Sequence, residues 1–394
     1  MDDGRGSGNG TALYVSVGPA LTRFSIDPAG ATLTRCETVQ LPESVQYAWP
    51  HASHRYLYVA SSDGAPGGGP RGNRHYLSAF HVAPKTGVLS ALGEPMALSD
   101  RPIYLSTDRH SNHALLAFNK PAAIKVYRIG ADGIPGEEVP QAASIDPGIF
   151  PHQIRTTPDD RQVTVTARGN DATPDKAEDP GRLTVFDFEN GVLRPAMVVA
   201  PNRGFGFGPR DLDFHPNQPW AYLSLERENE IVMLDWRDEA NPQLRYRKTT
   251  LAHPERRLGR QIAGVVHVHP KGHVAYVANR ASATMEVDGR DVLVGGENSL
   301  AVFALDQSTG EPHLIQSIDT DGVHPRTFHI DPSGQLLIVA HTMAGTAREG
   351  AGFRDIPARL TVFRIAADGT LTLTRSYDVD VGERLMFWMG MFAC

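Results

Sequence analysis

Charged side chains recur at two fixed distances from four prolines in this chain. The prolines are Pro158, Pro216, Pro270 and Pro332. Counting six residues back from each gives His152, Arg210, Gly264 and Arg326, and counting ten forward gives Arg168, Glu226, Arg280 and Thr342. Imidazole and carboxylate groups transfer protons, whereas arginine forks bind carboxylate or phosphate and stabilise an oxyanion. If the fold brings these positions together, the set suits proton-transfer chemistry on an anionic substrate.

These positions recur because the sequence is built from a repeat. An apolar strand followed by a polar turn, as in LTVFDFENG and LTVFRIAADG, occurs seven times, with equivalent positions at Phe24, Phe80, Tyr127, Phe186, Leu234, Phe303 and Phe363. Most copies are preceded by two more strand patterns, such as TFHIDPSG and QLLIVAH, and a fourth pattern follows, such as LTLTRSYDVD. Alternating polarity bounded by Gly, Pro, Asp and Asn is typical of half-buried strands. Seven four-stranded antiparallel units predict an all-β, seven-bladed propeller.

The two ends of the chain are expected to share one blade. The first repeat lacks its innermost strand, because TALYVSV already matches the second strand of the other units. The last repeat is complete by about Val381, yet LMFWMGMF follows. We expect this C-terminal segment to supply the missing strand and close the ring, which leaves no open sheet edge. The alternative is a tail that caps the core. Residues 1–10 read as a disordered tail, and residues 11–394 as a single propeller domain.

One face of the propeller is predicted to carry the site. The prolines mark the turn between the first and second strands, so the start of the first and the end of the second lie on the opposite face. Long insertions rich in glycine, proline and charge fall between the second and third strand patterns, on that same face, around Asp63–Arg74, Gly169–Gly181, Ala281–Asn298 and Thr342–Arg359. Loops on a rigid scaffold often carry function. We therefore expect the charged side chains and these loops to surround one funnel.

Each candidate also has a plain structural interpretation. An arginine in a propeller is often a solvated residue at the rim, and His152 follows a proline and could cap a turn. Glu226 lies in the charged run ERENE, beside Glu228 and Glu230, which would pass as a solvated loop. Agreement in register across several blades favours a shared site, because like charges gathered at one rim repel each other without a compensating ligand.

Composition and motifs argue against several other functions. The net charge of −7 disfavours nucleic acid and membranes as partners, and no apolar run approaches the roughly 20 residues of a membrane span. The opening residues have no signal-peptide pattern, and Cys36 and Cys394 fit a reducing compartment, so a cytoplasmic location is expected. His267 and His269 form an H-x-H, but no third ligand follows and His269 aligns with a turn position in other repeats. No metal or other cofactor is predicted. The oligomeric state is not readable from the sequence.

The sequence resembles the seven-bladed propeller lactonases, which include bacterial propeller-type 6-phosphogluconolactonases and fungal carboxymuconate cyclases. The resemblance covers nearly the whole chain and is sharpest in PHQIRTTPDD, FGPRDLDFHPN, VHPKGHVAYVANR and HPRTFHIDPSGQLLIVA. It implies an active site at His152, Arg210, Glu226 and Arg280. Counting from the four prolines selects the same four residues. The chain departs from the family at Leu225, Arg227 and His341, and it has longer insertions. These departures leave the substrate open.

The resemblance and the side chains together predict a metal-independent lactonase acting on a small anionic lactone, sugar-type or other. Arg210 and Arg280 would hold the substrate and polarise the carbonyl, Glu226 and His152 would transfer protons, and Arg326 and Arg168 would make secondary contacts. A cycloisomerase that closes an unsaturated diacid would use the same groups in the other direction. A non-catalytic propeller scaffold would not need the funnel charges.

Overall fold

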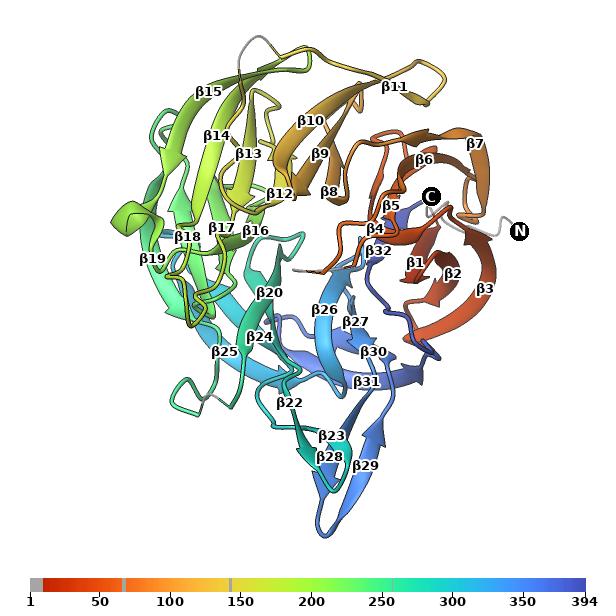
Figure 1. Ribbon diagram of the computed structural model, residues 1–394, viewed down its shortest axis with the longest axis vertical. Helices are drawn as coiled ribbons and strands as arrows, with labels where there is room; N and C mark the ends of the chain where they lie inside the picture. The colour runs from red at the N-terminus through yellow and green to blue at the C-terminus, as the bar shows by residue number, and fades with distance from the viewer. Residues whose placement is uncertain (1–9, 66–68, 142–143, 257) are drawn as a thin grey trace, which may run out of the picture.

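The strands of the computed structural model, which describes residues 10–65, 69–141, 144–256 and 258–394, form seven four-stranded sheets around a central axis (Figure 1). Neighbouring strands within each sheet are antiparallel, as in the pairing of Phe186 with Val163. The predicted all-β, seven-bladed propeller is therefore confirmed. The tail expected over residues 1–10 lies, up to residue 9, outside the described residues.

Each blade contains four strands, ordered from the central axis outward. Blade 1 is the sheet that contains β1 and β32, and blades 2 to 7 begin at β4, β8, β12, β16, β20 and β26 in chain order. The innermost strands are β4 (Ser44–Pro50), β8 (Pro102–Thr107), β12 (Pro151–Thr156), β16 (Pro209–Phe214), β20 (Gln261–Val268), β26 (Val323–Ile330) and β32 (Met389–Ala393). The second strands are β5 (Tyr56–Ser62), β9 (His113–Asn119), β13 (Gln162–Ala167), β17 (Trp220–Leu225), β21 (Val274–Ala281), β27 (Leu336–Met343) and β1 (Thr11–Val17).

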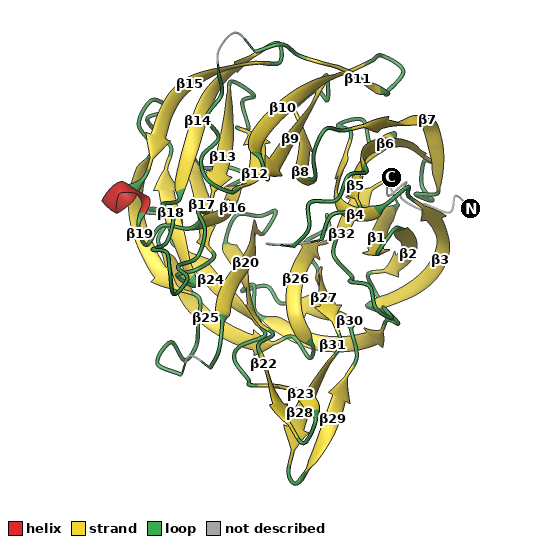
Figure 2. Ribbon diagram, viewed as in Figure 1, coloured by secondary structure: helices red, strands yellow, loops and turns green. Residues whose placement is uncertain are grey.

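The two outer positions complete the blades. The third strands are β2 (Ala20–Asp27), β6 (His75–Val82), β10 (Ala122–Ile129), β14 (Arg182–Glu189), β18 (Glu230–Asp235), β24 (Ser299–Leu305) and β30 (Arg359–Ile365). The outermost strands are β3 (Thr32–Gln40), β7 (Leu89–Ala97), β11 (Pro135–Glu138), β15 (Val192–Val199), β19 (Gln243–Thr249), β25 (Pro312–Asp319) and β31 (Leu371–Asp378). A short 3₁₀ helix, η1 (Pro201–Gly204), follows β15 (Figure 2). No helix among the described residues is long and apolar enough to cross a membrane.

The C-terminal strand closes the ring. β32 pairs antiparallel with β1, with Met391 opposite Leu13, and gives blade 1 its innermost strand. The innermost strands also contact one another in sequence around the axis, from β32 through β4, β8, β12, β16, β20 and β26 back to β32. Of the predicted segment LMFWMGMF, only the part from Met389 is strand, and Trp388 before it is 2% exposed in the core. The expected closure is confirmed, and the capping-tail alternative is wrong.

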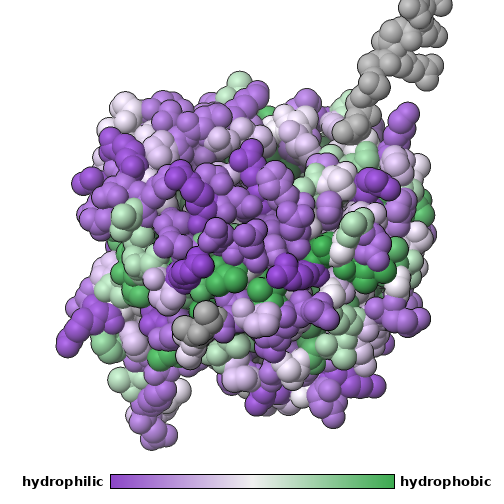
Figure 3. All heavy atoms as spheres, turned by 90° about the horizontal axis from the view of Figure 1, so that it is seen from above, coloured by the Kyte–Doolittle hydropathy of each residue, from purple (hydrophilic) through white to green (hydrophobic). Residues whose placement is uncertain are grey.

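Burial follows the order of the strands. The second strand β9 is buried at every position, because sheets pack on both of its faces, whereas the outermost strand β31 is exposed at most positions. The side of the ring shown in Figure 3 is accordingly hydrophilic over most of its area, with separate apolar patches. The repeat thus buries apolar surface between neighbouring blades, as stacked repeats do.

Tyrosines of the second strands bind neighbouring blades together. The Tyr222 hydroxyl donates to the Gly310 carbonyl at 2.9 Å, and that of Tyr276 donates to the Gly369 carbonyl at 2.8 Å. Gly369 has a φ of +88°, and a Cβ there would lie 2.1 Å from Val274 Cγ2. Only glycine fits this close approach without strain. The tight outer turns of the repeat are therefore glycine turns for a packing reason.

One histidine of the H-x-H motif, His269, serves the turns of the repeat, as His215 does in blade 5. His269 Nε2 lies 3.0 Å from the Gly334 carbonyl of blade 7, and His215 Nε2 lies 2.7 Å from the Gly272 carbonyl of blade 6. Each histidine therefore links the inner turn of its own blade to that of the next. Among the described residues, no three His, Cys, Asp or Glu side chains come together as a metal-binding group.

The insertions lie where the sequence analysis expects them, between the second and third strands. In blade 6 the insertion forms the hairpin β22 (Thr284–Val287) and β23 (Arg290–Leu293), and in blade 7 it forms β28 (Gly345–Glu349) and β29 (Gly352–Ile356). The two hairpins contact each other through β23 and β28 and project beyond the ring (Figure 1).

Candidate active site

Bulges in the innermost strands aim side chains at the central channel. The pairing of β12 with β13 skips His152, that of β16 with β17 skips Arg210, and that of β26 with β27 skips Arg326. A bulge leaves one residue unpaired and redirects its side chain. The ladders of blades 2 and 3 skip Gln46 and Ile103 in the same way. The fixed distance from the prolines therefore reflects a bulge repeated from blade to blade.

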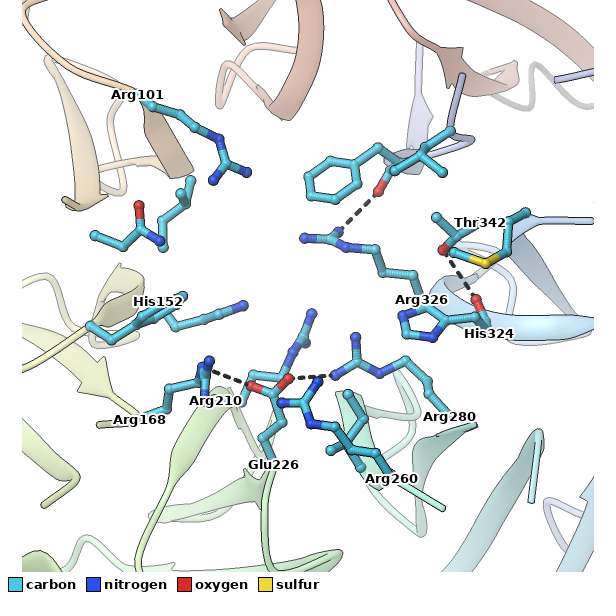
Figure 4. A pocket seen from close by; sticks show the side chains of 17 residues that line it. Arg101, His152, Arg168, Arg210, Glu226, Arg260, Arg280, His324, Arg326 and Thr342 are labelled. Carbon is cyan, nitrogen blue, oxygen red and sulfur yellow. Dashed lines mark hydrogen bonds and ion pairs between the residues drawn. The ribbon is translucent and has the colours of Figure 1, made fainter. Parts of the chain in front are cut away.

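The predicted side chains meet around one cavity of about 210 Å³ (Figure 4). All positions counted from the prolines line it except Gly264, namely His152, Arg168, Arg210, Glu226, Arg280, Arg326 and Thr342. A Cβ at Gly264 would lie 3.0 Å from Cβ of Ala278 and 3.3 Å from Nε of Arg280, so the glycine leaves room for both neighbours. Seven of the eight positions counted from the prolines thus meet at one cavity, and Gly264 is the exception.

Glu226 lies between two arginines at the end of β17. Its Oε1 accepts a hydrogen bond from Nη2 of Arg280 at 3.0 Å, and its Oε2 lies 3.3 Å from Nε of Arg168. The Glu226 residue is only 6% exposed. Burial raises the pKa of Glu226, but the positive charges of Arg168, Arg280 and Arg210 outweigh this effect and hold the pKa below its usual range. Glu226 is therefore a carboxylate at neutral pH and a weak proton acceptor.

His152 and Arg210 stand on adjacent blades, and both lie near the Asp211 carboxylate. Arg210 forms an ion pair with the buried Asp211, and Nδ1 of His152 lies 3.9 Å from Oδ1 of the same aspartate. Gln153 also donates to Oδ1 of Asp211, at 3.3 Å. Burial, and then the charge of Arg210, lower the pKa of His152 well below its usual value. The imidazole is consequently neutral at pH 7 and able to accept a proton.

The cavity carries a strong positive charge. Six arginines line it, namely Arg101, Arg168, Arg210, Arg260, Arg280 and Arg326, while Glu226 is the one acidic lining residue in the described part of the chain. Asp171, nearer the surface, pairs with Arg260 at 2.6 Å and with Arg168 at 3.4 Å. Buried like charges raise the free energy of the empty site, so an anionic ligand is the natural complement.

Sequence reasoning missed four lining residues with polar side chains: Arg101, Asn119, Arg260 and His324. Blade 3 has Arg109 where other blades have the turn proline, and the same count from Arg109 gives Ile103 and Asn119, both in the cavity. Arg101 and His324 stand two residues before the bulge positions Ile103 and Arg326. Arg260 carries no such signal, because it lies in the irregular segment before β20.

Backbone strain accompanies the site at two equivalent positions. Phe150 and His324 each have a φ of 57° and each line the cavity two residues before a bulge. Non-glycine residues in this region carry a conformational penalty and are concentrated at functional sites. The backbone N of His324 donates to Oδ1 of Asn298 at 3.0 Å, and its carbonyl accepts from Thr342, which holds the strained turn in place.

This arrangement resembles a site for acyl chemistry on an anion. A neutral imidazole can take a proton from water, and buried guanidinium groups can bind a carboxylate and stabilise an oxyanion. A family profile described as "Lactonase, 7-bladed beta-propeller" matches residues 11–348. The chain belongs to the seven-bladed β-propeller lactonase family. Family membership confirms the resemblance seen in the sequence and the expectation of a lactonase.

Relatives within this lactonase family carry specific names. A 6-phosphogluconolactonase of Bacillus subtilis (strain 168) is 25% identical over 327 residues, which is 82% of this chain and 84% of the relative. A 6-phosphogluconolactonase of Klebsiella pneumoniae (strain 342) is 27% identical over 316 residues, covering 79% and 82% of the two chains. These relatives match most of the propeller at moderate identity.

Solved structures of the lactonase fold superpose on nearly the whole chain. The periplasmic gluconolactonase of Pseudomonas aeruginosa gives a TM-score of 0.73 at 20% identity, covering 97% of this chain and 99% of that one. A putative 6-phosphogluconolactonase of Bacteroides uniformis gives 0.72 at 19% identity, covering 98% and 100%. These likenesses show a shared fold.

Proposed function

We propose that this lactonase hydrolyses a small anionic lactone of the sugar type in the cavity around Glu226. The observation that carries the proposal is the position of the largely buried His152 side chain beside Arg210 in a cavity lined by arginines. The names of the Bacillus and Klebsiella relatives support a phosphorylated sugar lactone as the substrate.

Arg210 and Arg280 supply the positive charge for the reacting carbonyl. Both guanidinium groups are almost fully buried, at 3% and 4% exposure, and the Nε atom of each has no hydrogen-bond partner in the described structure. Donors held in a dry site stabilise developing negative charge more strongly than donors in water. In the proposal these two arginines bind the oxygen that becomes negative as the carbonyl carbon turns tetrahedral.

His152 acts as the base in the proposed reaction. Water attacks the carbonyl carbon while the imidazole takes its proton, giving a tetrahedral oxyanion. The ring C–O bond then breaks, and the imidazolium returns the proton to the ring oxygen, so that lactone and water become one hydroxy acid. Asp211 favours the transient imidazolium, because an opposite charge nearby stabilises the protonated form.

In the proposed reaction Glu226 positions arginines and does not act as the base. Both of its oxygens face guanidinium groups, those of Arg280 and Arg168, whereas Nδ1 of His152 has no hydrogen-bond partner in the described structure. The carboxylate therefore orients both arginines and offsets part of their charge. The sequence analysis left the base open between Glu226 and His152, and the surroundings of each side chain support His152.

Proton release from a panel of sugar lactones, phosphorylated and not, tests the proposal with a pH indicator in weak buffer. We expect turnover in the wild type, loss in Arg210→Ala and in His152→Ala, and near-normal rates in Arg109→Gln, which removes an arginine from the opposite face. Silence of the wild type across the panel would contradict hydrolysis. Turnover of carboxylated muconates would then identify a cycloisomerase, and inactivity on both panels would identify a scaffold.

Metal independence and a cytoplasmic location remain predictions. Addition of a chelator in the same assay tests the first, with unchanged turnover expected. The second rests on the unpaired Cys36 and Cys394, and one structural relative is named as periplasmic. Fractionation of the cells that make this protein distinguishes the two compartments.

A further inference from the structure

Two arginines of the cavity differ from the others in their partners. Arg168, Arg210 and Arg280 each face a carboxylate, either Glu226 or Asp211. Arg101 and Arg326 form no ion pair with any acidic side chain in the described part of the chain. Both guanidinium groups point into the open centre of the cavity, away from Glu226 (Figure 4).

Neutral groups hold Arg101 in position. Its Nε donates to Oε1 of Gln46 at 2.9 Å, and Nε2 of Gln46 donates in turn to the Ser44 carbonyl at 3.1 Å. Gln46 is the bulge residue of blade 2, so the backbone fixes its amide. Arg101 is only 5% exposed, and burial lowers its pKa to about 10. The site therefore holds a buried cation whose protein partner is an amide.

Uncharged groups, the carbonyl and the ring of Phe387, also hold Arg326 in position. Its Nη1 donates to the Phe387 carbonyl at 2.9 Å, and its guanidinium carbon lies 3.6 Å from the centre of the Phe387 ring. Stacking on an aromatic face orients a guanidinium and leaves its remaining N–H groups free for a ligand. Burial, then the charges of Arg280 and Arg101, lower the pKa of Arg326 to about 9. The two unpaired arginines thus line the same cavity from different blades.

We propose that Arg101 and Arg326 determine specificity by binding an anionic group of the substrate that is remote from the reacting carbonyl. This inference rests on the proposed function for the position of the carbonyl, at Arg210 and Arg280. An anionic ligand group, phosphate or carboxylate, supplies the negative charge that the protein withholds from this pair. Phosphate suits the pair best, because its charge of about −1.5 to −2 balances two guanidinium groups.

The arrangement links ring closure to substrate choice. Phe387 belongs to the segment that leads into β32, and the backbone N of Met386 in this segment donates to the Thr342 carbonyl at 2.9 Å. The C-terminal segment therefore completes blade 1 and also supplies the platform for Arg326. Closure of the ring therefore fixes the position of Arg326 relative to Arg101.

Calorimetric binding of three acids tests the proposal without requiring turnover. The probes are 6-phosphogluconate, glucarate and gluconate, which differ in the group at the end remote from the shared carboxylate. We expect wild type to bind one of the first two more tightly than gluconate. Arg101→Gln and Arg326→Gln should each weaken that ligand about tenfold or more, since a charge-assisted pair is lost, and should change gluconate binding less than about threefold. Arg109→Gln is the control.

The outcomes separate the two proposals. Selective loss for 6-phosphogluconate assigns a phosphate, and selective loss for glucarate assigns a carboxylate. Equal loss for all three acids, no loss, or a wild type that prefers neither 6-phosphogluconate nor glucarate over gluconate overturns the specificity role of the pair. If wild type hydrolyses no lactone but the selective loss is found, the proposed function is wrong, and the proposal that Arg101 and Arg326 bind an anionic group is supported.

Melting temperatures show whether a loss of binding in the variants comes from misfolding. Removing an unpaired buried charge should leave the melting temperature of the empty protein unchanged or raised, so both glutamine variants are expected to fold. Inorganic phosphate should raise the melting temperature of wild type and raise it less in either variant. An equal increase in all three proteins would contradict the proposal. If a glutamine variant does not fold, Arg101→Lys, which keeps the charge, should retain the preference for the acid that wild type binds more tightly than gluconate.

Discussion

The Arg280 guanidinium donates to Oε1 of Glu226 at 3.0 Å, and the same nitrogen donates to the Ala263 carbonyl at 2.7 Å. Glu226 comes from blade 5, whereas Arg280 and Ala263 come from blade 6. The pair therefore joins two blades at the rim of the cavity. Because both side chains are nearly fully buried, loss of one charge leaves the other without compensation.

Glu226→Gln should reduce both stability and turnover. The amide keeps the shape but removes the charge that balances Arg168 and Arg280, so we expect a loss of about 2 kcal/mol in the free energy of unfolding. Misplaced arginines should lower kcat/KM by about 10–100-fold. Denaturant titration and the proton-release assay measure the two effects. Glu230→Gln, which removes a more exposed charge from the same run, is the control, and equal effects in both variants would refute the assignment.

The pH profile of kcat/KM should show a low acidic limb. Burial and the charge of Arg210 lower the pKa of His152 well below 6.5, so the imidazole stays neutral and competent at pH values below 6.5. Arg210→Gln removes the largest of the charges that lower the pKa of His152, and the acidic limb of its residual activity should move to higher pH. His152→Ala should abolish most turnover. An unmoved limb in Arg210→Gln would mean that another group titrates.

Asp171→Asn should improve the binding of anionic lactones. Asp171 pairs with Arg260 and Arg168 at the edge of the cavity and so competes with an anionic substrate for both. The pair with Arg260 is partly exposed, so the effect is modest: we expect KM to fall about 2–5-fold at low salt, with kcat unchanged. At about 1 M salt the difference should vanish, because salt screens exposed charges. Asp175→Asn, in the same loop, should change KM less.

The fold is readable from the sequence because each blade repeats its local signals. The apolar third strand, exemplified by Phe186 and Phe303, recurs with a turn behind it, and both residues lie in third strands of the structure. Closure by β32 is also predictable, since one strand was missing at the start and one was in excess at the end. The β22–β23 and β28–β29 hairpins are less regular, and the sequence marks them only as insertions.

The site is readable only where it follows the repeat. His152, Arg210 and Arg326 occupy equivalent bulges, so counting from a proline finds them. Arg101 lies outside the two counted positions, in a blade that lacks the proline, and Arg260 lies outside any strand. The partners of each arginine are also invisible in the sequence, because carboxylate or amide contacts depend on which blades become neighbours.

Asp213 should make stability depend on pH in the acid range. Its Oδ1 accepts from Nη1 of Arg155 at 2.8 Å, and its Oδ2 lies 3.7 Å from Nδ1 of His267. Burial raises the pKa of Asp213, but His267 and Arg155 together outweigh burial and lower it to about 2. A carboxyl group with a depressed folded-state pKa stabilises the protein above its unfolded pKa, and this contribution fades as pH falls from about 4 to about 2.

Asp213→Asn should therefore cost about 2 kcal/mol of unfolding free energy at pH 7 and should flatten the decline of stability between pH 4 and pH 2. Denaturant titrations at several pH values measure both effects. Asp378→Asn is the matched control, because Asp378 pairs with Arg359 at 3.0 Å but its side chain is 65% exposed, and its loss should cost less than about 1 kcal/mol. If the decline below pH 4 persists in Asp213→Asn, another buried carboxyl group sets the acid stability of the propeller.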